Sequence, residues 1–206
     1  MPLFITFEGG EGCGKSYQAH LLYRKLKTLA LPAILTHEPG GTLIGEKITR
    51  LLKWAQDEDI SPLTELMLFN ASRAQLIEKV IKPALENDNM VITDRFTDST
   101  IAYQGYGRGL DIKLIKAINN TAASGLKPDL TVLLDIPEEE GLTRKIRQKA
   151  DRFHQENMAF HRRVRNGFLQ LAAEEPKRWL VIDARQSRSQ ISRIIWERVG
   201  KLIILR

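Results

Sequence analysis

The sequence predicts a three-layer α/β fold in which a five-stranded parallel sheet is covered by helices on both faces. Five short apolar segments recur along the chain, and longer segments with helical character separate them. Each apolar segment is nearly free of polar residues, as is typical of strands buried on both faces. Alternation of strands with helices favours parallel pairing, because each helix serves as a crossover. With 206 residues, we expect one domain spanning residues 1–206.

The predicted strands occupy residues 3–7, 33–36, 90–93, 130–134 and 179–182. The predicted helices occupy residues 15–29, 42–54, 61–86, 112–123, 137–149, 155–174 and 187–202. Ser61 and Pro62 form a good N-cap and first turn, Pro137 also suits a first turn, and Pro83 is expected to kink or shorten its long helix. Ligands of such sheets bind beyond the carboxyl ends of the strands, so the residues after each strand are candidates for a site.

Composition narrows the classes of protein. Lys and Arg exceed Asp and Glu by 31 to 25, giving a net charge of +6, which favours acidic ligands without separating nucleotides from nucleic acid. No apolar run approaches the roughly 20 residues of a membrane span, and the first residues lack the pattern of a signal peptide. The lone Cys13 permits no intrachain disulfide. We therefore expect a cytoplasmic protein without a membrane segment.

The strongest motif follows the first predicted strand. Residues 9–16 match the pattern G-x-x-x-x-G-K-[ST] in its required position between a strand and a helix, and they read Gly9, Gly10, Glu11, Gly12, Cys13, Gly14, Lys15, Ser16. Glycines let successive backbone N–H groups turn around a phosphate, and the helix that starts at Lys15 adds its positive end. The motif predicts an ATP site in which Lys15 reaches the β- and γ-phosphates and Ser16 binds Mg²⁺.

A second candidate group follows the third predicted strand. Asp94 lies where an apolar run meets the phosphate site, so we predict that it is a partner of Mg²⁺, although a strand-end aspartate can also cap a turn. Arg95 is better placed to bind phosphate than to enter a core. An ATP site alone does not identify the molecule that accepts the phosphoryl group.

Further segments resemble the thymidylate kinase family and occur in that family's order between residues 4 and 184. They are Phe7-Glu8-Gly9, Glu38-Pro39-Gly40-Gly41-Thr42, Phe69 with Arg73, Asp94-Arg95-Phe96, Ala102-Tyr103-Gln104-Gly105 and Lys127-Pro128-Asp129-Leu130. Residues 38–42 and 103–105 are the specific parts, whereas many enzymes share the phosphate loop. The resemblance implies ATP-dependent phosphorylation of dTMP to dTDP with Mg²⁺.

The same resemblance implies a site for the acceptor. Phe69 is expected to stack on thymine and Arg73 to hydrogen-bond the base, although the residues alone leave open that Phe69 is core and Arg73 solvated. Tyr103 is implied to lie beside the sugar and to disfavour a 2′-hydroxyl. The side chains implied to approach the base are Ser99, Thr100 and Gln104.

Charged residues complete the implied acceptor site. Glu8 and Glu38 match carboxylates near the acceptor and the metal, and Pro39 belongs to the same segment. Glu38 could equally hold the turn at residues 39–41. Arg95 is implied to bridge the donor and acceptor phosphates, so Lys15, Arg95 and Glu8 are candidate catalytic residues.

Residues 141–154 resemble the mobile lid of the family, with the cations Arg144, Lys145, Arg147, Lys149 and Arg152. A basic helix that faces solvent is the alternative. No Arg or Lys precedes Lys15 in the phosphate loop, and family members of that type resemble those that supply an arginine from the lid. Arg147 is therefore expected to be catalytic, and Arg144 is expected to lie near adenine, together with residues 184–186.

Four positions depart from the family pattern: Tyr17, which is expected to contact ATP, and His37, Ser72 and His154. They bear on rate and selectivity more than on the class of reaction. The alternatives are a kinase for another pyrimidine monophosphate such as dUMP or UMP, and a P-loop ATPase or switch that acts on a protein partner. A nucleic-acid binder is not expected, because no such motif occurs. The resemblance also implies a homodimer.

Overall fold

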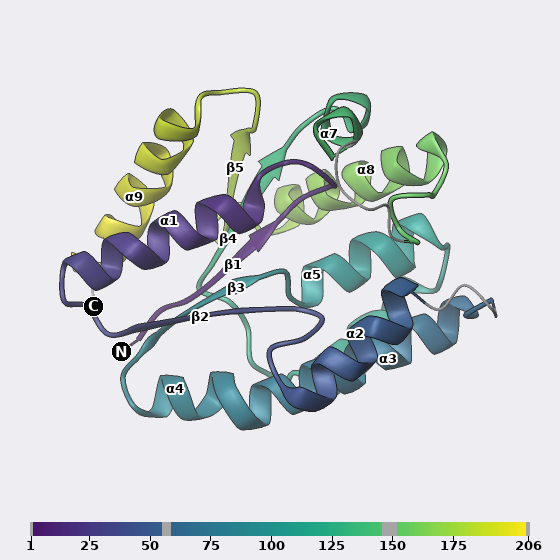
Figure 1. Cartoon of the computed structure of the whole chain (residues 1–206), viewed down its shortest axis with the longest axis horizontal. Coiled ribbons are helices and arrows are strands. Elements are labelled where there is room, and N and C mark those ends of the chain that lie inside the picture. The colour runs from purple at the N-terminus through teal and green to yellow at the C-terminus, as the bar shows by residue number, and fades with distance from the viewer. Residues whose placement is uncertain (1, 55–58, 146–151, 205–206) are drawn as a thin grey trace.

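The computed structural model describes residues 2–54, 59–145 and 152–204. Its centre is a parallel sheet of five strands in the order β2-β3-β1-β4-β5 (Figure 1). The strands are β1 (Phe4–Glu8), β2 (Ala33–His37), β3 (Met90–Asp94), β4 (Leu130–Asp135) and β5 (Trp179–Asp183). Each predicted strand is confirmed to within about one residue, because segments buried on both faces must be apolar throughout.

The register of the sheet aligns the ends of the central strands. Phe7 of β1 lies opposite Asp94 of β3, and Glu8 lies opposite Leu133 of β4. His37, the last residue of β2, also lies opposite Asp94. The residues that follow β1, β2 and β3 therefore emerge along one edge of the sheet, as expected for a ligand site of this fold.

Two helices cover one face of the sheet. They are α1 (Lys15–Thr28) and α9 (Arg188–Ile204), which lie side by side in Figure 1. Alternate side chains of β1 pack on opposite faces of the sheet. Ile5 and Phe7 belong to the hydrophobic cluster with α1 and α9, whereas Phe4 belongs to a cluster on the other face. The resulting core fixes β1, and with it the start of the phosphate loop.

Further helices complete the fold, and among them are those that carry Phe69, Arg73 and Arg144. These helices are α2 (Leu43–Trp54), α3 (Pro62–Leu76), α4 (Lys82–Glu86), α6 (Ile112–Ala122), α7 (Glu138–Lys145) and α8 (Met158–Glu174). The side chain of Ser61 caps α3 by accepting from the backbone N–H of Thr64, which confirms the predicted start of that helix. The later part of the helix predicted at residues 137–149 lies outside the described residues.

The predicted helix at residues 61–86 is one helical run with an irregular centre. A π-helical segment, η1 (Ile77–Ile81), joins α3 to α4, and the backbone N–H of Lys82 bonds to the carbonyl of Ile77, five residues earlier. Pro83 follows at once and has no N–H to donate. The wider turn before it lets the chain pass the proline without ending the helix, so the expected kink takes the form of a π-helical turn.

One helical region was not predicted. It consists of α5 (Thr97–Thr100) and the π-helical segment η2 (Ile101–Gly107), directly after β3. Glycines and β-branched residues give this segment low intrinsic helix propensity. It packs so closely on α8 that a Cβ added at Gly107 would lie 2.6 Å from the Phe160 ring. Tertiary packing therefore stabilises a helix that local preference does not indicate.

Across the described residues, no helix combines the length and apolar character needed to cross a bilayer.

Candidate active site

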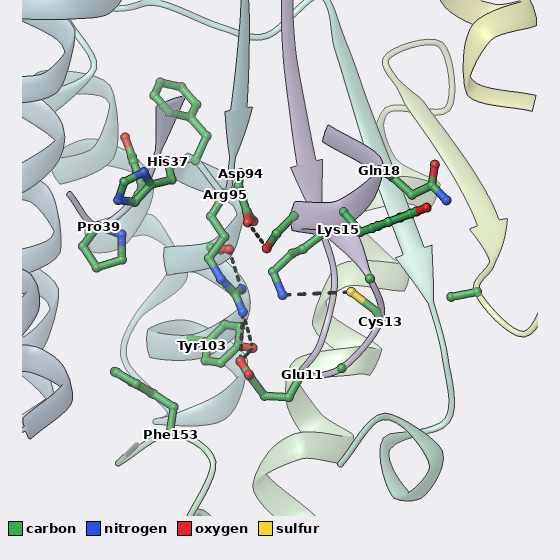
Figure 2. A pocket seen from close by; sticks show the side chains of 18 of the residues that line it. Glu11, Cys13, Lys15, Gln18, His37, Pro39, Asp94, Arg95, Tyr103 and Phe153 are labelled. Carbon is green, nitrogen blue, oxygen red and sulfur yellow. Dashed lines mark hydrogen bonds and ion pairs between the residues drawn. The ribbon is translucent and has the colours of Figure 1, made fainter. Parts of the chain in front are cut away.

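A cleft of about 910 Å³ opens beyond the carboxyl ends of the strands (Figure 2). One side of its lining is the phosphate loop from Glu11 to Ser16, and the other side comes from β2, α3 and the segment after β3. Predicted residues that line it outside the loop are Tyr17, Glu38, Pro39, Phe69, Arg73, Asp94, Arg95, Ser99, Thr100, Tyr103, Gln104 and Arg144. The predicted ATP and acceptor residues thus meet in one cavity, although they are scattered along the chain.

The phosphate loop has the conformation that its glycines permit. Gly12 and Gly14 have φ angles of 67° and 90°, which favour glycine strongly. Gly12 also lies against α7, and a Cβ added to it would be 1.9 Å from the carbonyl oxygen of Gly141. Lys15 is buried at the centre of the loop, where its Nζ donates to the carbonyl of Gly10 at 3.1 Å. Gly9 and Gly10 shape the loop without lining the cleft.

Ser16 and Asp94 meet where the phosphate loop approaches the end of β3. The Ser16 hydroxyl donates to Asp94 Oδ2. Asp94 Oδ1 is buried and, among the described residues, has no hydrogen-bond partner. A hydroxyl and a carboxylate with a spare oxygen, beside a phosphate loop, are the hard oxygen ligands that suit Mg²⁺.

Arg95 lies between the two halves of the cleft. Its guanidinium donates to Glu11 of the phosphate loop at 2.9 Å, to the Tyr103 hydroxyl at 3.2 Å and to Ser99 at 3.1 Å. Figure 2 shows the side chain extended from the end of β3 toward Glu11 and Tyr103. Its φ of 71° is uncommon for a residue with a side chain and turns the chain sharply after β3. This geometry directs a permanent positive charge toward the space in front of the phosphate loop.

Glu8 lies behind the cleft and does not line it. Its side chain is fully buried, accepting from the backbone N–H of Phe96 at 2.8 Å and from the Ser99 hydroxyl at 2.5 Å. Burial, with a further contribution from the Asp98 carboxylate, raises the pKa of Glu8 to about 8. Its observed contacts hold the turn that presents Arg95 and Ser99, whereas the sequence suggested a carboxylate close to the acceptor.

Glu38 and Arg73 form a buried ion pair. Arg73 Nη2 lies 2.7 Å from Glu38 Oε2, and both side chains are at most 3% exposed. The Arg73 guanidinium also donates to Asn70, Asn119 and the backbone carbonyl of Phe96. Burial raises the pKa of Glu38, and the positive charge of Arg73 opposes that rise. The alternative of a solvated Arg73 is therefore wrong, because its guanidinium is buried and donates to several groups inside the protein.

Aromatic side chains form the wall beside this pair. Phe69 is partly buried and lines the cleft, and its ring centre lies 5.8 Å from that of Phe153. Tyr103 packs edge-on against Phe153 at 6.0 Å, and burial raises the pKa of its phenol well above the ordinary value. The protonated Tyr103 hydroxyl donates to Glu11 at 3.0 Å, which joins this wall to the phosphate loop.

The remaining predicted residues fall in two places. Arg144 Nη1 donates to the carbonyl of Ala184 at 3.0 Å, so the predicted adenine region is assembled from α7 and the loop after β5. Tyr17 is 44% exposed, and the Arg188 guanidinium lies 4.5 Å from its ring centre. Arg147 and the middle of the predicted lid lie outside the described residues.

Two of the residues that depart from the family pattern, His37 and Ser72, make defined polar contacts. His37 lines the cleft, and its Nε2 lies 3.1 Å from Glu46 Oε1. The Ser72 hydroxyl accepts from the backbone N–H of Gly40 at 3.1 Å, so it supports the turn that follows β2.

Several lining residues were not found from the sequence. They are Gln18, Lys53, Phe96, Phe153, Ser187, Arg188 and Ile191, whereas Ala184 and Gln186, which also line the cleft, belong to the segment expected near adenine. Phe153 follows Asp151-Arg152, which could have indicated its proximity to the site. Phe96 directly follows Arg95 in the chain. The others lack a local signal, because only the packing of α1, α2 and the segment at the start of α9 directs them toward the cleft.

A phosphate loop and a second set of buried polar side chains share one cavity, as a transfer between two bound molecules requires. The protein is therefore a P-loop kinase, a phosphotransferase. The chain belongs to the thymidylate kinase family, whose model matches residues 7–195.

Similar proteins support this membership across the whole chain. The thymidylate kinase of Dehalococcoides mccartyi (strain ATCC BAA-2266 / KCTC 15142 / 195) is 59% identical over 205 residues, which cover 100% of this chain and 99% of that protein. The thymidylate kinase of Roseiflexus sp. (strain RS-1) is 44% identical over 98% of this chain and 94% of its own. A crystal structure of thymidylate kinase from Ehrlichia chaffeensis matches with a TM-score of 0.77 at 35% identity, covering 100% of this chain and 99% of that chain.

Proposed function

We propose how this chain performs the reaction of its family, the transfer of the γ-phosphoryl group of ATP to dTMP. The main support is the single cleft that the phosphate loop shares with Arg95, Phe69 and Arg73. In this arrangement a donor on the loop and an acceptor on the aromatic wall present their phosphates to each other. Arg95 lies at the junction, where it contacts both Glu11 and Tyr103.

ATP occupies the side of the cleft formed by the loop. Backbone N–H groups of residues 9–16 and the start of α1 bind the phosphates, and Lys15 neutralises the charge on the β- and γ-phosphates. Adenine lies near Arg144 and Ala184, which are held together by a hydrogen bond of 3.0 Å. Tyr17, beside Arg188, contacts the same nucleotide from the first turn of α1.

Ser16 and Asp94 are the residues that hold Mg²⁺. The unpartnered, buried Oδ1 of Asp94 supports this assignment. Among the described residues no group of three or more His, Cys, Asp or Glu side chains could hold a metal. Mg²⁺ typically binds proteins through one or two carboxylates together with waters and phosphate oxygens. When bound, the ion neutralises charge that develops on the phosphates.

dTMP occupies the other side of the cleft. Thymine stacks on Phe69, while the buried guanidinium of Arg73 faces its oxygen acceptors. Tyr103 lies beside the sugar and leaves no room for a 2′-hydroxyl, which gives the preference for deoxyribose. Ser99 and Thr100, on the turn after β3, contact the acceptor from the same wall.

The chemistry needs no strong base. An oxygen of the dTMP phosphate attacks the γ-phosphorus, the bond from that phosphorus to the β,γ-bridging oxygen breaks, and ADP leaves. Lys15 and Arg95 stabilise negative charge on the transferring group, as does Arg147, our proposed catalytic residue from the lid. Glu8 contributes by holding the turn of Arg95 and Ser99.

The reaction is tested by measuring ADP release from ATP with dTMP, dUMP, UMP, CMP, AMP or thymidine, with and without Mg²⁺. We expect turnover mainly with dTMP, only in the presence of Mg²⁺, and slow ATP hydrolysis without acceptor. A different preferred monophosphate would contradict the assignment of Phe69 and Arg73. Release that does not depend on an acceptor would favour an ATPase that acts on a protein partner.

We also propose a homodimer. Exposed apolar side chains gather on α2, α3 and α6, namely Leu43, Ile44, Leu51, Leu63, Met67 and Leu114. Light scattering should give about twice the 23.5 kDa of one chain. Met67→Glu should shift the mass toward the monomer, since it places charge in the contact, whereas Leu29→Glu at the end of α1 should not. A wild-type mass of one chain at tens of micromolar would contradict the proposal.

We place the reaction in the cytoplasm. The single cysteine, Cys13, is buried and free, which is compatible with a reducing compartment.

A further inference from the structure

A fully buried carboxylate, Glu65 of α3, lies beside the acceptor wall of the cleft. Its Oε1 accepts from Gln104 Nε2 at 2.7 Å and from Arg108 Nε at 3.2 Å. Its Oε2 accepts from Arg108 Nη2 at 3.2 Å and from Arg152. Four N–H donors thus surround one carboxylate, and two of the three donating side chains are permanently charged.

This arrangement fixes the orientation of the Gln104 amide. Both oxygens of Glu65 accept hydrogen bonds from arginine, which can only donate. If the amide were reversed, Gln104 Oε1 would meet a carboxylate oxygen, and two acceptors would face each other without a proton between them. Glu65 therefore holds the amide nitrogen of Gln104 toward itself, so that the amide oxygen, Oε1, points away from Glu65.

The opposite end of the amide is left as an acceptor. Gln104 lines the cleft, and its Oε1 has no hydrogen-bond partner among the described residues. Arg73 also lines the cleft, and its guanidinium can only donate hydrogen bonds. One wall of the acceptor site therefore combines a group that can only donate with an amide that Glu65 restricts to accepting.

This pair is complementary to one kind of pyrimidine. Thymine and uracil present an oxygen acceptor at C4 next to a donor, N3–H, whereas cytosine presents a donor, the C4 amino group, next to an acceptor, N3. We infer that Glu65 is a specificity-determining positioning residue, which makes the enzyme select pyrimidines with an N3–H over cytosine by fixing the Gln104 amide. The inference rests on the proposed placement of the thymine ring against Phe69, Arg73 and Gln104.

The expected selectivity is large because a mispaired base leaves buried polar groups unsatisfied. Cytosine would place its amino group against the Arg73 guanidinium and its N3 against Gln104 Oε1. Sites built to hydrogen-bond one pattern reject a substrate that cannot pair with it by factors of about 10⁴. Rotation of Gln104 would relieve half of this mismatch, and Glu65 opposes that rotation.

The test compares kcat/KM for dTMP and dCMP in the wild type and in Glu65→Gln. A glutamine at position 65 can donate as well as accept, so the Gln104 amide can turn and pair with cytosine. We expect the preference for dTMP over dCMP to fall at least about tenfold, because one buried hydrogen bond is gained and one lost. Glu65→Asp keeps a group that only accepts, and it should retain the preference even if turnover falls.

Two further variants make the outcome specific. Glu174→Gln, on the exposed side of α8, is a matched control. It should leave kcat/KM unchanged for both dTMP and dCMP. Gln104→Leu tests the placement of the base separately. If Gln104→Leu leaves the preference unchanged, Gln104 does not read the base and the proposed acceptor site is wrong. Suppose instead that Gln104→Leu changes the preference while Glu65→Gln lowers kcat/KM for dTMP and for dCMP by the same factor. In that case only the role of Glu65 is overturned.

A measurement on the wild type covers the case in which Glu65→Gln does not fold. Gln104 Nε2 and Arg108 Nε donate to the same oxygen of Glu65. Their protons should therefore show a nuclear Overhauser effect in the free enzyme, with the Gln104 signals assigned by their loss in Gln104→Leu. Absence of that effect between assigned signals would mean that the amide is reversed, and it would overturn the inference.

Discussion

Replacement of Arg95 with alanine should lower kcat for dTMP phosphorylation by about 10³-fold, the effect typical of an arginine that stabilises a transferring phosphoryl group. The guanidinium lies between Glu11 of the phosphate loop and Tyr103 of the acceptor wall. It also donates to Ser99, so it links the phosphate loop to two residues of the acceptor wall. Steady-state kinetics with saturating ATP and dTMP measure the loss.

Controls separate this loss from a general defect. Arg95→Lys retains the charge but not the fork of donors, so it should recover only part of the activity. Arg193→Ala, on the exposed surface of α9, should leave kcat unchanged. Alanine and lysine have a Cβ, as arginine does. The backbone strain of a positive φ at position 95 is therefore similar in both variants and in the wild type. A kcat for Arg95→Ala within tenfold of the wild type would rule out a direct role in transfer.

Replacement of Arg73 with methionine should lower the free energy of unfolding by about 3–5 kcal/mol, because it leaves the buried Glu38 carboxylate without its partner. Arg73 and Glu38 are almost completely buried and lie 2.7 Å apart. Several buried acceptors, including Asn119, lose a donor as well. Chemical denaturation followed by circular dichroism measures the change, and binding of dTMP should weaken in parallel.

The direction of the pH dependence follows from Glu38. Burial already raises the pKa of Glu38, and loss of Arg73 removes the main opposing effect. A carboxyl group with a raised pKa in the folded state favours folding at low pH, and this contribution is lost as the pH rises through the folded-state pKa. Arg73→Met should therefore be more destabilised at pH 8 than at pH 5.

Two comparisons check this explanation. Arg162 also pairs with glutamates but is 61% exposed, so Arg162→Met should leave stability nearly unchanged. Adding Glu38→Gln to Arg73→Met should restore part of the stability, because the unpaired charge is gone. Equal stability losses in Arg73→Met and Arg162→Met would contradict the role of burial.

Features set by short stretches of chain could be predicted well. The phosphate loop is one such feature, because glycine spacing, Lys15 and Ser16 all belong to one continuous segment. The five strands are another, since burial on both faces requires uninterrupted apolar runs. The pair Asp94 and Arg95 was found for the same reason, as it directly follows β3.

Features set by packing between distant segments could not be predicted in this way. The sequence identified Glu38 and Arg73 but left open a solvated arginine, and only the fold encloses the two as a pair. Glu8 was expected near the acceptor, yet its hydrogen bonds to Phe96 and Ser99 place it behind the cleft. Whether a polar side chain lines a cavity or supports its wall depends on neighbours about 90 residues away.

By itself, the sequence determined the order of strands and helices, the phosphate loop and the family, because each depends on residues that are close in the chain or fixed in order. The tertiary structure decided the helical form of residues 97–107, which packing on α8 stabilises against their low propensity. It also decided the surroundings of Glu65, which no motif had singled out. Four N–H donors from two segments, residues 104–108 and Arg152, meet one buried carboxylate there, and a buried charge is stable only when such partners surround it.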